Sequence, residues 1–402
     1  MGSVAQTKSK EPIQATAPKK VSIFGATGSV GCSTISLINE RPENFQIEVL
    51  TANRNVKKLA EQAISLKARK AVIATTDLYE ELKDCLSGTG VEAAAGADAL
   101  IEAASEPVDW VMSAIVGAAG LAPTLAAIQT GSVVALANKE ALVCAGDMML
   151  QNVEKFGATL LPVDSEHNAI FQVLDLEQMD KVERIILTAS GGPFLKLSYE
   201  EMRNVTLAQT LAHPNWDMGA KISVDSATMM NKGLELIEAV HLFPVGNDDV
   251  DIIIHPQSII HSMVEYGDGS ILAQMGAPDM RTPISYALGW PNRHKFKANR
   301  LDFGEMSALT FMEPDTSQFP ALKLAKFALN TGKSAPTILN AANEVAVGGF
   351  LKGQIGFLDI VSIVEETLNC AKFVEFSDIS DIYVEDRNGR EIASNILRNK
   401  CA

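Results

Sequence analysis

The stretch Lys20-Val21-Ser22-Ile23-Phe24-Gly25-Ala26-Thr27-Gly28-Ser29-Val30-Gly31 decides the fold class of this chain. A short apolar run ends in glycines spaced three residues apart, and an apolar helical pattern continues from Val30 to Ile38. Glycines at such a turn let the backbone approach a pyrophosphate, which the unpaired amides of a helix N-terminus can hold. The alternative is a purely structural turn. We favour a dinucleotide site, because this turn comes after the first strand of an alternating fold.

Short apolar runs alternate with helix-length segments from Lys20 to about Pro162. One helical pattern begins at Asn55, a residue that can cap it, and continues to Leu66. We expect strands at Val21–Phe24, Ile47–Thr51, Ala71–Ala74, Val108–Ser113, Ser132–Leu136 and Thr159–Val163. The alternation predicts an α/β protein whose N-terminal part is a doubly wound, Rossmann-like parallel sheet, with ligands at the carboxyl ends of the strands.

One segment of this region, from Trp110 to Asn138, carries no charged residue and exceeds the roughly 20 residues that a membrane helix needs. Glycines and Pro123 divide it into shorter units, however. We therefore interpret it as a buried strand, a helix over Leu121–Gln129 and a second buried strand.

The composition limits the classes of function. Hydrophobic residues make up 47% of the 402 residues and charged residues 21%, which is ordinary globular usage and excludes a disordered or fibrous protein. A net charge of -15 disfavours binding to nucleic acid or to a membrane surface, because both are anionic. The 5 cysteines are scattered and form no Cys-x-x-Cys pair, which indicates reduced thiols and a cytoplasmic enzyme.

The length indicates two or three domains. A hairpin is expected where Gly267-Asp268-Gly269 joins two apolar runs, and helical patterns fill the chain beyond Phe319. We divide the chain into a mobile tail (1–19), a cofactor-binding domain (20–163), an α+β catalytic domain (164–289), a linker (290–315) and a small C-terminal helical bundle (316–402).

The end of the second strand bears on the choice of dinucleotide. An NAD site usually places an acid there to bind the ribose 2′-hydroxyl. Glu48 has a suitable spacing but lies inside the strand, whereas Arg54 stands at its tip. A cation at that position suits a 2′-phosphate, so the pattern favours NADP, unless Arg54 is simply a solvated loop residue.

Acidic residues cluster in two separate segments. If Asp164 to Glu166 is extended, both carboxylates point the same way, and in a helix over Ser226–Glu238 Asn231 and Glu235 share one face. Carboxylates that meet in one site repel unless a proton or a cation lies among them, and all-oxygen ligands select a hard ion such as Mg²⁺ or Mn²⁺. The alternative is that Asp164 caps a helix and Glu235 forms a surface pair.

Two further motifs lie between these acidic segments. Ala189-Ser190-Gly191-Gly192-Pro193-Phe194 comes after an expected strand and could hold an anion through its amides and the Ser190 hydroxyl, or be an ordinary tight turn. In His213-Pro214-Asn215-Trp216, a loop Trp is as a rule packed rather than functional. His241, His255 and His261 form no metal-binding pattern, and we leave them structural.

Taken together, these motifs resemble the 1-deoxy-D-xylulose 5-phosphate reductoisomerase family, over almost the whole chain from Lys20 onward. The resemblance rests on six motifs in this order: Gly25–Gly31, Ala137–Leu142, Val163–His167, Ala189–Phe194, His213–Trp216 and Lys221–Glu235. One departure is Asn53-Arg54 at the tip of the second strand, where the family often has Gly-Lys. Arg keeps the positive charge, so the departure leaves the expected cofactor unchanged.

The resemblance implies roles for the matching positions. The cofactor would be held by Thr27, Gly28, Ser29, Val30, Arg54, Asn55, Asn138, Glu140 and Gly219. The divalent cation would be held by Asp164, Glu166 and Glu235. The substrate would be bound by Lys139, Ser165, Glu166, Ser190, His213, Trp216, Ser226, Asn231, Lys232 and Glu235. Within that set, Ser190, Ser226, Asn231 and Lys232 would face the substrate phosphate, Trp216 would lie on a flap, and Lys139, Glu166 and His213 would be catalytic.

The resemblance also implies the reaction, in which 1-deoxy-D-xylulose 5-phosphate is rearranged and reduced to 2-C-methyl-D-erythritol 4-phosphate in non-mevalonate isoprenoid synthesis. It needs NADPH and one divalent cation, Mg²⁺, Mn²⁺ or Co²⁺, and implies a homodimer in the bacterial cytoplasm, with a plastid as the alternative. Two other functions stay open on the residues alone. They are another NADP-dependent oxidoreductase of a phosphorylated or small polar substrate, and a catalytically silent NADPH sensor.

Overall fold

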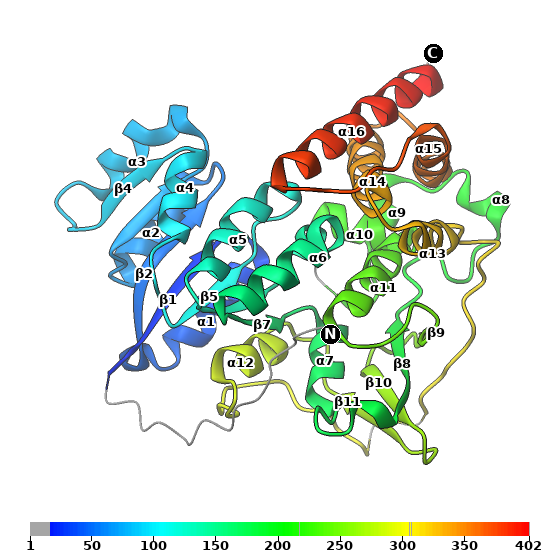
Figure 1. Cartoon of the computed structure of the whole chain (residues 1–402), viewed down its shortest axis with the longest axis horizontal. Coiled ribbons are helices and arrows are strands. Elements are labelled where there is room, and N and C mark those ends of the chain that lie inside the picture. Colours follow the sequence, from blue (N-terminus) through cyan, green and yellow to red (C-terminus); the bar gives the residue numbers. More distant parts are fainter. Residues whose placement is uncertain (1–16, 217, 305, 307, 402) are drawn as a thin grey trace. The chain divides into compact units, whose positions relative to one another are not determined.

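The computed structural model describes residues 17–401 apart from 217, 305 and 307, and the chain divides into two compact units (Figure 1). The first unit comprises Met1–Ala141, Asp147–Asn168 and Met280–Ala298, and the second Leu142–Gly146, Ala169–Asp279 and Asn299–Ala402. Most of the expected tail, residues 1–16, lies outside the described residues. The expected end of the tail at residue 19 is too late, because Lys19 already begins the first strand. Its Nζ donates to the carbonyl oxygen of Leu288 at 2.9 Å.

The first unit is built on a parallel sheet of seven strands in the order β4-β3-β2-β1-β5-β6-β7. Its strands are β1 (Lys19–Phe24), β2 (Phe45–Ala52), β3 (Lys70–Ile73), β4 (Glu92–Ala95), β5 (Trp110–Ser113), β6 (Val133–Leu136) and β7 (Thr159–Pro162). The order reverses between β1 and β5, which is where doubly wound sheets bind their ligands. The predicted doubly wound sheet is therefore confirmed, with β4 as an additional edge strand.

Helices connect these strands. They are α1 (Ser29–Asn39), α2 (Val56–Ser65), α3 (Tyr79–Leu86), α4 (Ala97–Ala104), α5 (Leu121–Gln129) and α12 (Arg281–Gly289), while α6 (Lys139–Phe156) and α7 (Ser165–Val173) contribute residues to both units. The uncharged segment at Trp110–Asn138 forms β5, α5 and β6 as expected. Among the described residues, every helix is either too short or too polar to span a lipid bilayer.

Helix α12 corrects one expected grouping. The sequence division places Arg281–Gly289 in the catalytic domain, but α12 contacts α1 and β6 of the first unit. The indole nitrogen of Trp110, a fully buried residue of β5, donates to the carbonyl oxygen of Ala287 at 3.0 Å. A chain segment can return to an earlier domain, and sequence order alone does not reveal such a return.

The second unit holds a mixed sheet of four strands in the order β11-β10-β8-β9. The strands are β8 (Val182–Ala189), β9 (Val250–Ile254), β10 (Ile260–Tyr266) and β11 (Ile271–Met275). Strands β8 and β9 are parallel, and the other neighbours are antiparallel. The hairpin predicted around Gly267-Asp268-Gly269 is confirmed as β10 and β11.

The remaining helices of the second unit include the expected C-terminal bundle. They are α8 (Tyr199–Met202), α9 (Leu207–Leu211), α10 (Ala220–Ala227), α11 (Met230–Leu242), α13 (Ala321–Thr331), α14 (Ala335–Leu351), α15 (Phe357–Cys370) and α16 (Ile379–Cys401). Helix α14 contacts both α15 and α16. Between α14 and α16, burial lowers the pKa of Arg390, but the hydrogen bond to Asp386 and the charge of Glu344 outweigh burial and raise it.

A glycine at the end of β1 allows the following turn to form. Gly25 has φ +86°, and a Cβ atom built there would lie 2.5 Å from the carbonyl oxygen of Ala114, directly after β5. Only a residue without a side chain fits both conditions. We expect Gly25→Ala to lower the free energy of unfolding by about 2–4 kcal/mol, since positive φ and a backbone clash both contribute.

Gly88→Ala is the matched control, because Gly88 has φ +74° but no atom within 4 Å of a built Cβ. It should cost about 1 kcal/mol, the conformational part alone. Urea unfolding of both variants measures the difference. Equal losses would show that the close approach of β1 and β5 does not require glycine.

Candidate functional site

The glycine turn after β1 leaves an uncapped helix N-terminus that suits an anion. Helix α1 begins after Gly28 with no side-chain cap and with no acidic residue in its first turn. Gly31 is required for the tight packing of the turn, because a Cβ there would lie 2.4 Å from the carbonyl oxygen of Gly25. Free amides and the positive end of the helix dipole make this turn suited to a pyrophosphate.

Two residues of α2, which the sequence analysis missed, hold this turn in place. Lys58 Nζ donates to the carbonyl oxygen of Thr27 at 3.1 Å, and Gln62 Nε2 donates to that of Ala26 at 3.1 Å. The two side chains are one helical turn apart and therefore share a face of α2. The spacing of Lys58 and Gln62 is visible in the sequence, but the carbonyl oxygens that accept their hydrogen bonds are not.

The structure around β2 agrees with the interpretation that Glu48 is not the acid of an NAD site. Glu48 is 8% exposed and its carboxylate lies 2.9 Å from Arg69 Nε, so its charge is already paired. Arg54 is exposed, and Asn55 accepts a hydrogen bond from the Lys58 amide at 3.2 Å, which confirms it as the cap of α2. A cationic tip of this kind is compatible with a 2′-phosphate.

Asn138, Lys139 and Glu140 follow β6 and are all nearly buried. Asn138 caps α6 by accepting from the Ala141 amide at 3.1 Å and donates to the carbonyl oxygen of Gly117 at 3.0 Å. Its amide group therefore has a structural task in addition to the cofactor role that the family resemblance implies. Lys139 Nζ donates to the carboxylate of Asp164.

The segment from Asp164 to Glu166 is not extended, so the condition under which both carboxylates would point the same way along a strand is not met. Helix α7 begins at Ser165, and the carbonyl oxygen of Asp164 accepts from the Asn168 amide at 2.8 Å. Asp164 precedes the helix, as the alternative interpretation had it, and Ser165 Oγ donates to Glu166 Oε2 at 2.6 Å. These polar groups therefore lie at the N-terminal end of a helix and not along a strand.

The expected helix over Ser226–Glu238 is also wrong, because it is two helices. Helix α10 ends at Ala227, and Met229 adopts a left-handed conformation with φ +63° before α11 begins at Met230. The break creates a helix N-terminus immediately before Asn231 and Lys232. Helix α11 has no side-chain cap and no acid in its first turn, so this N-terminus favours an anion.

Glu235 on α11 is fully buried, which rules out the alternative of a surface pair. Asn231 Nδ2 and Lys232 Nζ each donate to one of its carboxylate oxygens. The predicted common face of Asn231 and Glu235 is thereby confirmed. A buried carboxylate needs such donors, because an uncompensated charge in the interior costs several kcal/mol.

The glycine-serine turn lies after β8 and against the α10–α11 break. Ser190 Oγ lies 2.9 Å from His213 Nε2 and accepts from the Gly192 amide at 3.1 Å. Gly192 has φ +68°, and a Cβ there would lie 2.8 Å from the carbonyl oxygen of Ser226. The second unit therefore gathers Ser190, His213 and Ser226 around one turn.

Trp216 and Gly219 lie on the segment between α9 and α10. Trp216 is half-buried and its indole ring lies 6.0 Å from the His261 ring, tilted by 56°. Gly219 precedes α10 and is exposed. The contact with His261 agrees with the expectation that a loop Trp is packed.

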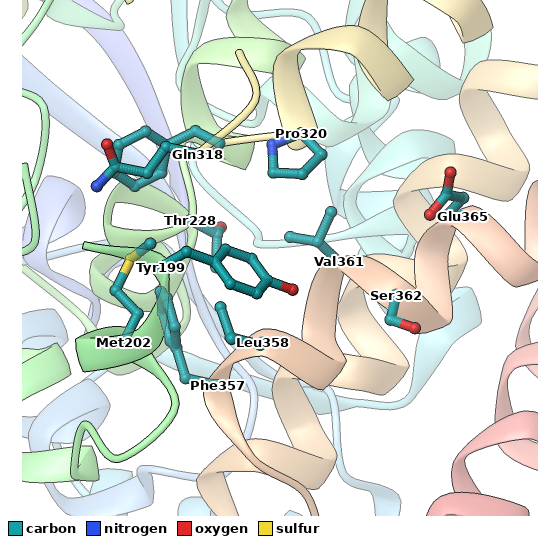
Figure 2. A pocket seen from close by; sticks show the side chains of 11 residues that line it. Tyr199, Met202, Thr228, Gln318, Pro320, Phe357, Leu358, Val361, Ser362 and Glu365 are labelled. Carbon is teal, nitrogen blue, oxygen red and sulfur yellow. The ribbon is translucent and has the colours of Figure 1, made fainter. Parts of the chain in front are cut away.

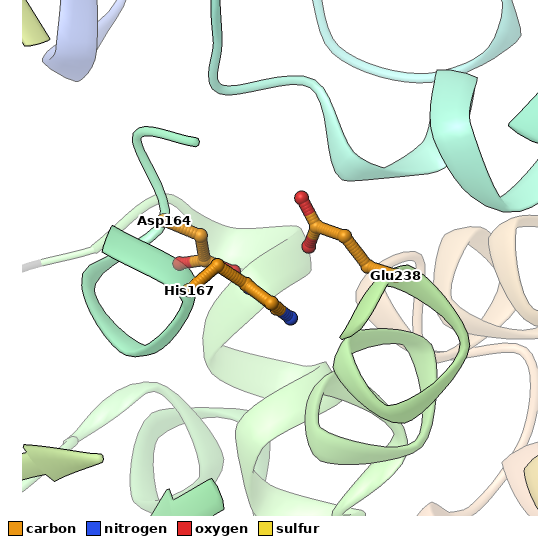
Figure 3. Close-up of side chains that lie close together, drawn as sticks. All are labelled: Asp164, His167 and Glu238. Atoms are coloured by element: carbon orange, nitrogen blue, oxygen red, sulfur yellow. The ribbon is translucent and has the colours of Figure 1, made fainter. Parts of the chain in front are cut away.

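Two groups of side chains among the described residues offer ligand atoms for a metal ion. The first is Asp164, Glu166 and Glu235, and the second is Asp164, His167 and Glu238. Figure 3 shows that Asp164 and His167 come from the start of α7 and Glu238 from α11. The first group is the predicted one, and its carboxylate oxygens suit a hard divalent cation, whereas an imidazole suits softer metals.

A separate pocket of about 170 Å³ lies in the second unit (Figure 2). It is lined by Tyr199, Met202, Thr228, Gln318, Phe319, Pro320, Phe357, Leu358, Val361, Ser362 and Glu365. None of these is a predicted site residue. The ring of Phe357 meets Phe194 edge to face at 5.0 Å, so this wall supports the far end of the glycine-serine turn.

The fold and the glycine turn define the class of the protein as a dinucleotide-binding protein. Comparison with known proteins defines its family. Three family models match. The model of 1-deoxy-D-xylulose 5-phosphate reductoisomerase covers residues 21–146, and models of that enzyme's C-terminal domain cover residues 160–243 and 275–392.

Curated relatives match over nearly the full length. The 1-deoxy-D-xylulose 5-phosphate reductoisomerase of Rhodospirillum centenum is 56% identical and covers 94% of this chain and 94% of its own length. The enzyme of the same name from Zymomonas mobilis is 54% identical and covers 95% of this chain and 98% of its own length.

Solved structures agree. The Zymomonas mobilis reductoisomerase in complex with NADPH has a TM-score of 0.90 and 53% identity, over 95% of this chain and 99% of that one. A reductoisomerase in complex with NADPH, fosmidomycin and magnesium has a TM-score of 0.91 and 42% identity, over 94% of this chain and 98% of that one. The chain belongs to the 1-deoxy-D-xylulose 5-phosphate reductoisomerase family.

A substitution at Lys232 tests the anion site at the start of α11. Lys232→Gln removes the positive charge but keeps a donor for Glu235. We expect the KM for a phosphorylated ketose to rise by about tenfold or more, since a charge-assisted hydrogen bond is lost, while kcat changes less. Lys326→Gln is the control, because Lys326 is half-exposed and pairs with Asp248 on the surface. An unchanged KM would contradict the role of Lys232.

Proposed function

We propose that Asp164, Glu166 and Glu235 hold one divalent cation for the reaction that gives this family its name. In that reaction 1-deoxy-D-xylulose 5-phosphate is isomerised and reduced with NADPH to 2-C-methyl-D-erythritol 4-phosphate. The observation that carries the proposal is the fully buried carboxylate of Glu235, in a chain that matches the family models over residues 21–146, 160–243 and 275–392.

The first unit fits NADPH. Its glycine turn brings uncapped amides of α1 to the reversal point between β1 and β5, and the exposed Arg54 stands at the tip of β2. Glu48, the acid that would select NAD, is paired with Arg69 instead. When bound, the nicotinamide supplies the hydride for the reduction.

The donor set fits a hard cation. Asp164, Glu166 and Glu235 offer carboxylate oxygens only, which is the chemistry that Mg²⁺ and Mn²⁺ prefer. Asn231 and Lys232 orient Glu235, while Ser165 orients Glu166 through a hydrogen bond. The cation, when bound, stabilises negative charge that develops on the substrate oxygens.

The chain's own residues bind and orient the substrate. Lys232 and the positive end of the α11 dipole attract the phosphate group, and the hydroxyls of Ser190 and Ser226 add hydrogen bonds to it. This phosphate anchor lies apart from the reacting carbons, so its binding energy can position them. In this proposal Lys139, whose Nζ donates to Asp164, would donate a proton or a hydrogen bond to a substrate oxygen.

The two other functions account for less of this geometry. A different NADP-dependent oxidoreductase would share the first unit but would have no use for a buried carboxylate beside a phosphate-binding helix terminus. A silent NADPH sensor would likewise have no use for a group of three carboxylates, those of Asp164, Glu166 and Glu235, that offers ligand atoms for a metal ion.

The assembly proposed with this function is a homodimer formed through the second sheet. Strand β11 is an edge strand, and Ile271 and Leu272, which face opposite sides of it, are 49% and 48% exposed. Exposed apolar residues on a free edge favour association with another strand. The proposed location is the bacterial cytoplasm, where exposed thiols such as those of Cys85 and Cys370 stay reduced.

Glu235→Gln tests the cation site with two readouts. In the native chain Mg²⁺ should raise the melting temperature by a few degrees, because it binds only the folded state. The variant should lose that shift, bind NADPH normally by fluorescence titration, and turn over about a hundredfold or more slowly.

Glu183→Gln on β8 is the control for the same chemical change at an exposed position. It should keep both the thermal shift and the rate. If Glu235→Gln retained near-normal turnover at saturating Mg²⁺, Glu235 would not be a ligand of the catalytic cation.

A further inference from the structure

The side chain of Asn215 joins two loops of the second unit. Its Nδ2 donates to the carbonyl oxygen of Pro256 at 2.7 Å and to Ser258 Oγ at 3.1 Å. Both hydrogens of the amide group are therefore used within the protein. Asn215 stands two positions after His213 and directly before Trp216, so its side chain anchors the segment that carries both residues.

The loop that receives Asn215 is itself firmly held. His255 is fully buried, its Nδ1 lies 2.9 Å from the carbonyl oxygen of Thr310, and its Nε2 accepts from the Ile259 amide at 3.2 Å. The ring is stacked on Phe311 with centroids 4.8 Å apart. His255, which the sequence analysis left structural, thus provides a fixed support for the turn at Pro256–Ser258.

The backbone around Asn215 selects the tautomer of His213. The amides of Asn215 and Trp216 donate to His213 Nδ1 at 3.2 and 3.0 Å. Because Nδ1 is an acceptor, the proton of the neutral ring resides on Nε2, which then donates to Ser190 Oγ at 2.9 Å.

The hydroxyl of Ser190 is polarised as a result. Its oxygen accepts from His213 Nε2 and from the Gly192 amide, so its own hydrogen is left to donate outward. The turn that carries this O–H packs against the end of α10, since a Cβ at Gly192 would lie 2.8 Å from the carbonyl oxygen of Ser226, and such an O–H is a donor for a phosphate oxygen. The orientation of that donor depends on His213, and the position of His213 depends on the anchored segment.

We propose that Asn215 is a positioning residue for the recognition of the substrate phosphate. It acts through His213 and Ser190, and it touches neither the substrate nor the cofactor. The inference rests on the proposed function, because it assigns the Ser190 turn to the substrate phosphate. The inference adds Asn215 to the proposed phosphate site, together with the hydrogen bonds that connect Pro256 through Asn215 and His213 to Ser190.

Asn215→Asp is the sharpest test, because the side chain keeps its shape but loses both donors and faces a carbonyl oxygen. We expect the KM for 1-deoxy-D-xylulose 5-phosphate to rise by about tenfold, as for the loss of one to two hydrogen bonds, with kcat within about threefold and the KM for NADPH unchanged. Ser258→Ala, which removes one acceptor of the two, should give a smaller rise.

Two controls separate positioning from general damage. Asn204→Asp makes the same chemical change at an exposed residue of the second unit and should leave all constants unchanged. The fluorescence of Trp216 is obtained by subtracting the spectrum of Trp216→Phe from that of the native chain, and the same subtraction is made in the Asn215→Asp background. The fluorescence of Trp216 should differ between the two backgrounds, while the melting temperature stays within a few degrees.

The outcomes distinguish this inference from the proposed function. If the native chain consumes NADPH with the ketose phosphate and Asn215→Asp has an unchanged KM, the positioning role is wrong and the function stands. If kcat and both KM values change together, Asn215 is only a structural residue and the inference is overturned. If the native chain has no activity with the ketose phosphate, the proposed function itself fails.

Discussion

A carboxylate buried without water must be balanced by positive charge, and the second unit is organised around that constraint at Glu235. Lys232 and Asn231, one turn earlier on α11, each hold one of its oxygens. Gly233, on the same helix, allows α11 to approach α13 closely, since a Cβ there would lie 2.7 Å from that of Ala325. Close packing of α11 on α13 helps to bury Lys232 and Glu235, and an ion pair is stronger in such a buried environment.

The backbone provides two sites for anions, at the N-termini of α1 and α11. In the first unit, glycines after β1 expose the uncapped N-terminus of α1. In the second, the left-handed residue Met229 ends α10 and starts α11, again without a cap. Both helices lack acidic residues in the first turn, so the chain keeps two local attractions for phosphate groups despite its net charge of -15. A phosphorylated cofactor and a phosphorylated substrate each require such a site.

Much of this arrangement could be predicted from the sequence, because it depends on local patterns. Apolar runs and the glycine spacing identified most strands of the first sheet, and Asn55 was recognised as a cap. Strand β4 was missed because Glu92–Ala95 is mostly alanine and lacks the β-branched residues that mark strands. The start of α7 at Ser165 was one of two alternatives, because the local pattern also allows an extended segment. The break at Met229 was missed because it involves neither Gly nor Pro, and the return of α12 to the first unit depends on tertiary contacts. The anchoring roles of Lys58 and Asn215 escaped for the same reason, since hydrogen-bond partners distant in sequence leave no local pattern.

The most direct measurement is a crystal structure of the chain grown with Mn²⁺, with the ion located by its anomalous scattering. The account predicts a single peak bound by oxygens of Asp164, Glu166 and Glu235, at a hard-ion distance of about 2.0–2.3 Å. A peak at other residues, or none at saturating Mn²⁺, would contradict it. In that case the burial of Glu235 would have to be explained by Lys232 and Asn231 alone.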